Sequence, residues 1–169
     1  MDNIFKGKAW TFGDNINSET ILLSGKEEDW EDAKKHVLEY HDPDFAKNVQ
    51  EGDFIVAGKN FGASSGRPAG EILKGVGIKA ILCESAGRVF YRNTWNMALP
   101  ILQCAELRGK VNKGDSLEVN VEQGLITLPS GEVLQCEPTP WMLMDVYHAG
   151  GMLEYITSRR SEYKTLEQI

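Results

Sequence analysis

The chain has 169 residues, 41% of them hydrophobic, and its 25 acidic and 18 basic side chains give a formal net charge of -7. This size suits one compact domain, and the scattered basic residues form no cluster for phosphate recognition, which argues against a nucleic-acid-binding protein. No apolar run approaches the roughly 20 residues of a membrane-spanning helix, and the N-terminus does not resemble a signal peptide, so we expect a cytoplasmic protein.

The N-terminal third of the chain combines short apolar groups with charged stretches. Residues 7–23 predict a strand, a turn-rich polar loop over residues 12–18, and a second short strand. Residues 27–40 are charged with apolar positions at helical spacing, and Pro43 separates them from another helical turn at residues 45–49. We expect this part to pack one face and to expose the other.

The middle of the chain predicts two helical crossovers between parallel strands. An apolar strand at residues 53–58 is followed by a loop rich in glycine and serine, a helix over residues 68–75 and a strand at residues 80–83. A second helix over residues 88–96 leads into another strand at residues 101–104. The glycine-rich loop therefore lies at the carboxyl end of a strand and before the start of a helix.

The C-terminal third has a different pattern. Alternating apolar and polar residues at 116–121, 125–128 and 131–134 predict an antiparallel meander. A helix over residues 141–149 is stopped by two glycines, and a polar tail covers about residues 157–169. We expect residues 1–169 to form a single α/β domain with this tail attached.

The loop over residues 62–67 is the part of the sequence best suited to chemistry. Backbone amides before a helix start form an anion site, and Arg67 adds a guanidinium fork that suits a carboxylate. Ser64 or Ser65 could act as a base if those groups stabilised its alkoxide. The alternative interpretation is an ordinary tight turn from strand to helix, with Arg67 a surface side chain.

Other reactive residue types form no recognisable site. The three cysteines (Cys83, Cys104 and Cys136) are an odd number with no Cys-x-x-Cys pair, so we expect core thiols that do not hold a metal or cluster. The three histidines (His36, His41 and His148) belong to charged or helix-end segments, where surface or half-buried positions are expected. Hydrolase chemistry of the Ser-His-Asp or Cys-His type therefore has little support.

Four segments together resemble the 3-isopropylmalate dehydratase small-subunit family: residues 13–16, 58–62, 88–93 and 150–155. The resemblance covers nearly the whole chain in the same order. It implies the swivelling β/β/α domain of aconitases, with a central mixed sheet, crossover helices and an antiparallel meander. It also implies a separate large subunit whose [4Fe-4S] cluster acts as Lewis acid, reversible dehydration of a hydroxy di- or tricarboxylic acid, and a place in branched-chain amino acid (leucine) biosynthesis.

The resemblance also assigns roles in the glycine-rich loop. The family pattern Gly-x-Gly-Ser-Ser-Arg, aligned without gaps, makes Ser65 the catalytic base and Arg67 a ligand of the substrate carboxylate. Ser64 then replaces the second glycine and Gly66 the second serine, and both are assigned to substrate binding. A shift of one residue would make Ser64 the base instead.

The first loop departs from the family pattern as well. Asp-Thr-Asp becomes Asn17-Ser18-Glu19, and the following Pro-x-Arg becomes residues 23–26, so Glu19 is expected to orient the site and Lys26 to replace the arginine. These changes favour a substrate other than isopropylmalate, of the homoaconitate, citramalate or dimethylmalate type, or a non-catalytic anion-binding paralogue.

Two arginines of the third segment also match family positions. They are Arg88 and Arg92, and we expect either a structural role, such as pairing with Glu84, or a role near the site. The catalytic set therefore does not include them.

Overall fold

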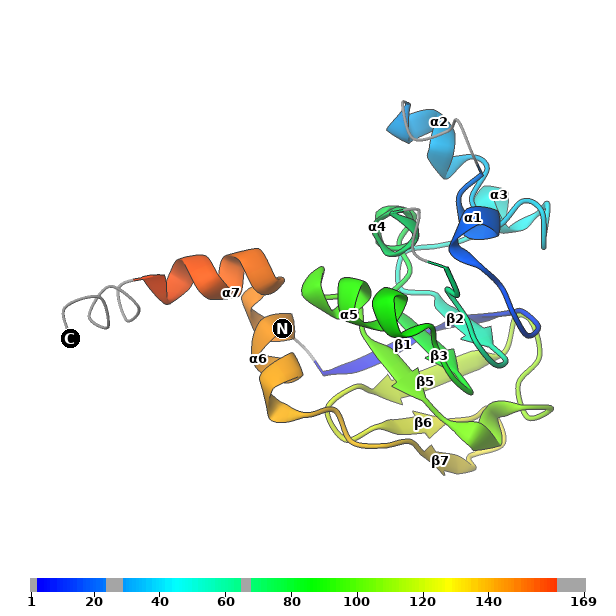
Figure 1. Cartoon of the computed structure of the whole chain (residues 1–169). Helices are drawn as coiled ribbons and strands as arrows, with labels where there is room; N and C mark the ends of the chain where they lie inside the picture. Colours follow the sequence, from blue (N-terminus) through cyan, green and yellow to red (C-terminus); the bar gives the residue numbers. More distant parts are fainter. Residues whose placement is uncertain (1–2, 24–28, 65–67, 161–169) are drawn as a thin grey trace.

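The computed structural model describes residues 3–23, 29–64 and 68–160, whose strands form one seven-stranded mixed sheet (Figure 1). Its strand order is β4-β3-β2-β1-β5-β6-β7. The strands are β1 (Ile4–Thr11), β2 (Phe54–Ala57), β3 (Ala80–Cys83), β4 (Ile101–Gln103), β5 (Ser116–Asn120), β6 (Leu125–Thr127) and β7 (Val133–Gln135). β1 to β4 pair in parallel, while β5 joins β1 antiparallel and continues into the antiparallel β6 and β7. The expected mixed sheet and meander are confirmed.

The helices connect and cover the parallel strands. They are α1 (Ser18–Ile21), α2 (Trp30–Lys34), α3 (Phe45–Asn48), α4 (Ala69–Gly75), α5 (Arg88–Asn96), the 3-10 turn η1 (Ala105–Leu107), α6 (Trp141–Ala149) and α7 (Met152–Ser158). α4 joins β2 to β3 and α5 joins β3 to β4, so both expected crossovers are present. No helix within the described ranges is long and apolar enough to cross a membrane.

Three local expectations need correction. The second short strand expected before residue 23 is the helical turn α1, because the Asn17 side chain caps it by accepting a hydrogen bond from the Thr20 amide at 2.9 Å. The helix expected over residues 27–40 is only the short α2, and Leu38 beyond it has a left-handed backbone (φ 56°). At the other end, α7 continues to Ser158, past the start of the expected polar tail.

The hydrophobic core has two layers, one on each face of the parallel strands. In β2, Ile55 and Ala57 face the cluster covered by α1 to α4, whereas Phe54 and Val56 face a second cluster. Meander residues such as Val119 complete that second cluster. The sheet curls, so that β5 to β7 cover the face of the parallel strands opposite α1 to α4 (Figure 1). The layers are therefore meander, parallel strands and helices, the β/β/α order that was expected.

Asp53, just before β2, ties the first two strands together from inside the protein. The residue is 4% exposed. One carboxylate oxygen accepts hydrogen bonds from Trp10 Nε1 and the Gln50 amide, both at 2.9 Å, and the other accepts from the Lys8 amide at 3.1 Å. These donors fix the start of β2 against β1, and so the place from which the glycine-rich loop leaves the sheet.

Asp53→Ala is expected to lower the free energy of unfolding by about 3 to 5 kcal/mol, because it leaves several partly or fully buried donors without an acceptor. Urea denaturation followed by circular dichroism measures this change. Asp44→Ala is the matched control, since Asp44 is exposed and its side chain does not cap α3. Equal stability of the two variants would show that Asp53 does not hold the strands together.

Candidate active site

The candidate site lies where the loops after β1 and β2 leave the sheet. We call residues 12–17 the first loop and residues 58–64 the second loop. Because β1 and β2 are parallel neighbours, both loops emerge at the same edge. The Ser18 amide donates to the Ala63 carbonyl at 2.9 Å, and the Gly62 amide donates to the Ile16 carbonyl at 2.7 Å. These backbone bonds hold the two loops side by side.

Three non-glycine residues in these loops have a left-handed backbone, which L-residues seldom adopt. They are Asn15 (φ 59°), Asn60 (φ 60°) and Ser64 (φ 68°). Asn15 and Asn60 support each other through an amide hydrogen bond of 3.1 Å. Ser64 takes a conformation that glycine would adopt without strain, and the ungapped alignment predicts the second glycine of Gly-x-Gly-Ser-Ser-Arg at this position.

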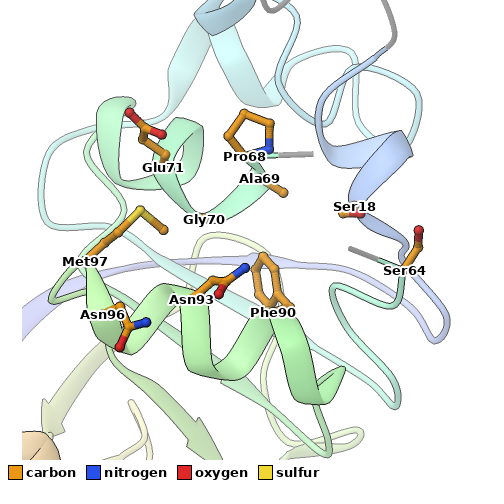
Figure 2. A pocket seen from close by; sticks show the side chains of 10 residues that line it. All are labelled: Ser18, Ser64, Pro68, Ala69, Gly70, Glu71, Phe90, Asn93, Asn96 and Met97. Atoms are coloured by element: carbon orange, nitrogen blue, oxygen red, sulfur yellow. The ribbon is translucent and has the colours of Figure 1, made fainter. Parts of the chain in front are cut away.

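A pocket of about 300 Å³ opens between the second loop, α4 and α5. Figure 2 shows Ser18 and Ser64 together at one end of the pocket, with Met97 and Glu71 at the other. Between them, Pro68 and Ala69 on one side and Phe90 on the facing helix form apolar walls, and the Asn93 amide points into the space (Figure 2). The pocket therefore combines a hydroxyl-lined end with an apolar surface.

Ser64 also lines a second pocket of about 400 Å³, together with Asn60 and Arg88. Within the part of the chain that the structure describes, Arg88 and Arg92 are exposed and have no carboxylate partner. The suggested pairing with Glu84 is wrong, because Arg108 occupies that carboxylate at 2.5 Å. Arg88 therefore adds an unpaired positive charge beside Ser64.

Arg108 also fixes the first loop from the opposite side. Its guanidinium contacts both Asp14 oxygens, at 2.5 and 2.7 Å, while Asp14 Oδ1 accepts from the Lys59 amide at 2.8 Å. The hydrogen bond from Arg108 and that from the Lys59 amide hold the pKa of Asp14 below its usual value. Asp14 therefore links the two loops to the segment after β4 as an ionised carboxylate.

Two of the six predicted site residues lie within the described ranges. Ser64 lines both pockets, and Glu19 is exposed on α1 next to the buried Ser18, outside the lining of the pocket. Ser65, Gly66, Arg67 and Lys26 lie outside the described residues. Their assigned roles stay predictions, as do those of Ser64 and Glu19.

His41 contacts α1 through the side chain of Thr20. Its Nε2 is 2.8 Å from Thr20 Oγ1, and that hydroxyl donates to the Asn17 carbonyl at 3.1 Å, which assigns the ring proton to Nε2. Burial lowers the pKa of His41, because the partly desolvated ring disfavours the charged form.

The native protein is therefore expected to lose stability as the pH falls below about 6.5, where the unfolded chain binds a proton at His41 more readily than the folded one. In His41→Gln this part of the loss should disappear, leaving a shallower dependence of the free energy of unfolding on pH between about 7 and 5. Urea titrations at several pH values measure it, with His148→Gln as the control because His148 is exposed on α6. Parallel pH curves for the wild type and His41→Gln would contradict the prediction.

Residues 1–106 match the model of the Aconitase C-terminal domain family, which is more than half of the chain. The chain belongs to this family. It is 42% identical to the isopropylmalate/citramalate isomerase small subunit of Methanocaldococcus jannaschii, over 96% of this chain and 99% of that protein. It is 40% identical to a 3-isopropylmalate dehydratase small subunit of Methanopyrus kandleri, over 92% and 94% of the two chains. A crystal structure of 3-isopropylmalate dehydratase from Methanocaldococcus jannaschii superposes with a TM-score of 0.84 at 32% identity, covering 96% and 98% of the chains.

The thiols of this aconitase-family chain are poorly suited to bind a cluster. Cys83, Cys104 and Cys136 are all buried and free. Burial raises the pKa of the Cys83 thiol to about 12 and raises that of Cys136 as well, whereas cluster ligation needs thiolates. Within the described ranges no three His, Cys, Asp or Glu side chains gather as metal ligands. The described residues therefore do not fit an iron–sulfur cluster.

Of the ten residues that line the pocket, the sequence predicts only Ser64 as a site residue. Ser18 belongs to the altered Asp-Thr-Asp pattern and Asn93 ends a family segment, but neither is predicted to be part of the site. The parallel bridge between Asn17 and Ala63 brings Ser18 to the second loop, a contact across 45 residues that local patterns do not reveal. In the sequence, the signal for Ser18 is only that a hydroxyl side chain lies in a turn-rich polar loop.

Proposed function

We propose that this chain is the small subunit of an aconitase-type hydro-lyase, which reversibly removes and re-adds water on a hydroxy di- or tricarboxylic acid together with an iron–sulfur large subunit. The observation that carries the proposal is the hydroxyl-lined pocket at the second loop, in a chain similar along 96% of its length to a small subunit of an isopropylmalate/citramalate isomerase. Chemistry of this class suits a cytoplasmic enzyme.

Ser65 is the proposed base, supported by the backbone of the residue before it. Ser64 has the left-handed φ that suits glycine, so the ungapped alignment, with Ser64 on the second glycine and Ser65 on the first serine, fits the chain better than a shift. The Ser65 alkoxide would accept a proton from the carbon next to a substrate carboxylate, and Arg67 would bind that carboxylate. Gly66 and Lys26 would complete substrate binding, and Glu19 would orient the site.

The other half of the reaction depends on the large subunit. When bound there, a [4Fe-4S] cluster supplies a Lewis acid for the departing hydroxyl. The three buried free cysteines, and the absence of a gathered set of metal ligands among the described residues, support placing the cluster in the partner. This chain's own part is to bind and orient the acid and to move the proton at the carbon.

The apolar wall of the pocket favours an alkyl-substituted malate as substrate. Pro68, Ala69 and Phe90 would contact a methyl or branched alkyl group, whereas the extra carboxylate of a homoaconitate-type substrate would lose hydration there without a partner. Isopropylmalate and citramalate, for which the isomerase of Methanocaldococcus jannaschii is named, both have this form. The altered residues 17–19 and 23–26 favour a substrate other than isopropylmalate.

The test is co-expression of the chain with an iron–sulfur large subunit from the same organism, anaerobic purification of the complex, and a screen of citramalate, 2-isopropylmalate, 2,3-dimethylmalate and homocitrate. We expect turnover of an alkyl-substituted malate by the complex and none by the chain alone. A cluster-loaded complex that hydrates or dehydrates none of these acids would overturn the proposal. It would favour the second candidate, a non-catalytic anion-binding paralogue, which the departures of both loops from the family pattern support.

A further inference from the structure

The Ser18 hydroxyl is a buried polar group without a partner. The residue is 1% exposed, and its Oγ makes no hydrogen bond to any described residue. Its backbone is satisfied, since the amide donates to the Ala63 carbonyl at 2.9 Å and the carbonyl accepts from the Leu22 amide at 3.2 Å. Only the side chain is left without an internal partner among the described residues.

Such a group is unfavourable in a folded protein unless something else bonds to it. A buried hydroxyl without a hydrogen bond costs about 1 to 3 kcal/mol. The other buried polar residues are bonded: Asp53 accepts from Trp10 and two amides, and Thr94 Oγ1 donates to helix carbonyls at 3.0 to 3.1 Å. Ser18 Oγ and Trp95 Nε1 are therefore the two buried side-chain polar atoms without a partner among the described residues, and of these two residues only Ser18 lines the pocket, beside Ser64.

We propose that Ser18 is a substrate-binding residue, whose hydroxyl donates a hydrogen bond to a carboxylate oxygen of the bound hydroxy acid. This inference rests on the proposed function. Ser18 and Ser64 form the end of the pocket away from Glu71 (Figure 2). Arg88, which has no carboxylate partner among the described residues, lines a second pocket together with Ser64. Donors and a positive charge thus gather at this end, where an anionic group is favoured.

The substrate orientation follows from the two ends of the pocket. A carboxylate held at Ser18 places the alkyl substituent along Ala69 and Phe90 (Figure 2). Backbone bonds from Ser18 to the second loop fix the hydroxyl relative to the residue before Ser65. Ser18 would therefore bind the substrate at a fixed place beside Ser64, in both the dehydration and the hydration direction.

Ser18→Ala in the cluster-loaded complex tests the proposal. We expect KM for citramalate or 2-isopropylmalate to rise about ten- to hundredfold, the effect of losing a hydrogen bond to a charged group. Stability of the variant should be unchanged or higher, because the removed hydroxyl has no internal partner. Ser18→Thr retains the hydroxyl and should recover most of the affinity, and Ser130→Ala, in the exposed turn before β7, should have no effect.

A Ser18→Ala complex with wild-type KM and kcat overturns the inference and leaves the proposed function standing. A Ser18→Ala variant that loses stability while KM stays unchanged also overturns the inference, because the hydroxyl then has a structural partner. If the wild-type complex is inactive on every acid, the proposed function fails, and the shift in Tm caused by citramalate decides on Ser18. A Tm shift that is present in the wild type and lost in Ser18→Ala supports the role of Ser18. A shift that persists in Ser18→Ala, or that the wild type does not show, overturns that role.

Discussion

Ser65→Ala is expected to lower kcat of the complex about a hundred- to ten-thousandfold, because general base catalysis contributes roughly 10² to 10⁴ and alanine cannot accept a proton. KM should change little, since substrate binding would depend on Arg67, Lys26 and the hydroxyl end of the pocket. Steady-state rates of hydration, with the cluster content of each complex measured separately, give both constants. Assembly with the large subunit should be as in the wild type.

Ser64→Gly is the matched variant for the neighbouring hydroxyl. It removes the strain of a left-handed serine (φ 68°), so stability should rise by about 1 kcal/mol. Loss of one hydroxyl from the pocket should change kcat by no more than about tenfold. The opposite result, a dead Ser64→Gly and an active Ser65→Ala, would show that the alignment is shifted by one residue and that Ser64 is the base.

The arrangement of strands and crossovers was predictable because its signals are local. The apolar run at residues 53–58 and the helical spacing over residues 88–96 each reflect burial along one element, and their alternation predicts parallel pairing. The first loop was harder to predict. Residues 18–21 look like a short strand by composition, but the Asn17 cap and pairing with Ala63 make them the helical turn α1.

The candidate site, too, was predictable only where its signals are local in the sequence. Glycine and serine between a strand and a helix pointed to the second loop, and the family resemblance supplied the roles. The left-handed Ser64 and the unpartnered Ser18 hydroxyl depend on contacts between loops far apart in the sequence. The choice of Arg108 over Arg88 as the partner of Glu84 likewise depends on how the segment after β4 returns to the sheet edge, which no spacing rule predicts.

Gly62→Ala is expected to lower the free energy of unfolding by about 3 kcal/mol or more and to disturb the second loop. A Cβ at this position would lie 2.2 Å from Cγ of Phe90, and the backbone is left-handed (φ 70°). Phe90 is 5% exposed and packs edge-on against Phe61, with ring centroids 5.6 Å apart, so the ring cannot move without opening the core. Urea denaturation measures the loss.

Gly109→Ala separates the two causes, because Gly109 has nearly the same φ (72°) but nothing within 4 Å of the added Cβ. It should lose only the roughly 1 to 2 kcal/mol of a left-handed alanine, and the difference between the variants then measures the clash with Phe90. Phe90 also lines the pocket, so Gly62→Ala should raise KM as well as lower stability, whereas Gly109→Ala should leave KM unchanged. Equal losses in both variants would mean that Phe90 yields freely, and that the close contact between the second loop and α5 does not shape the pocket.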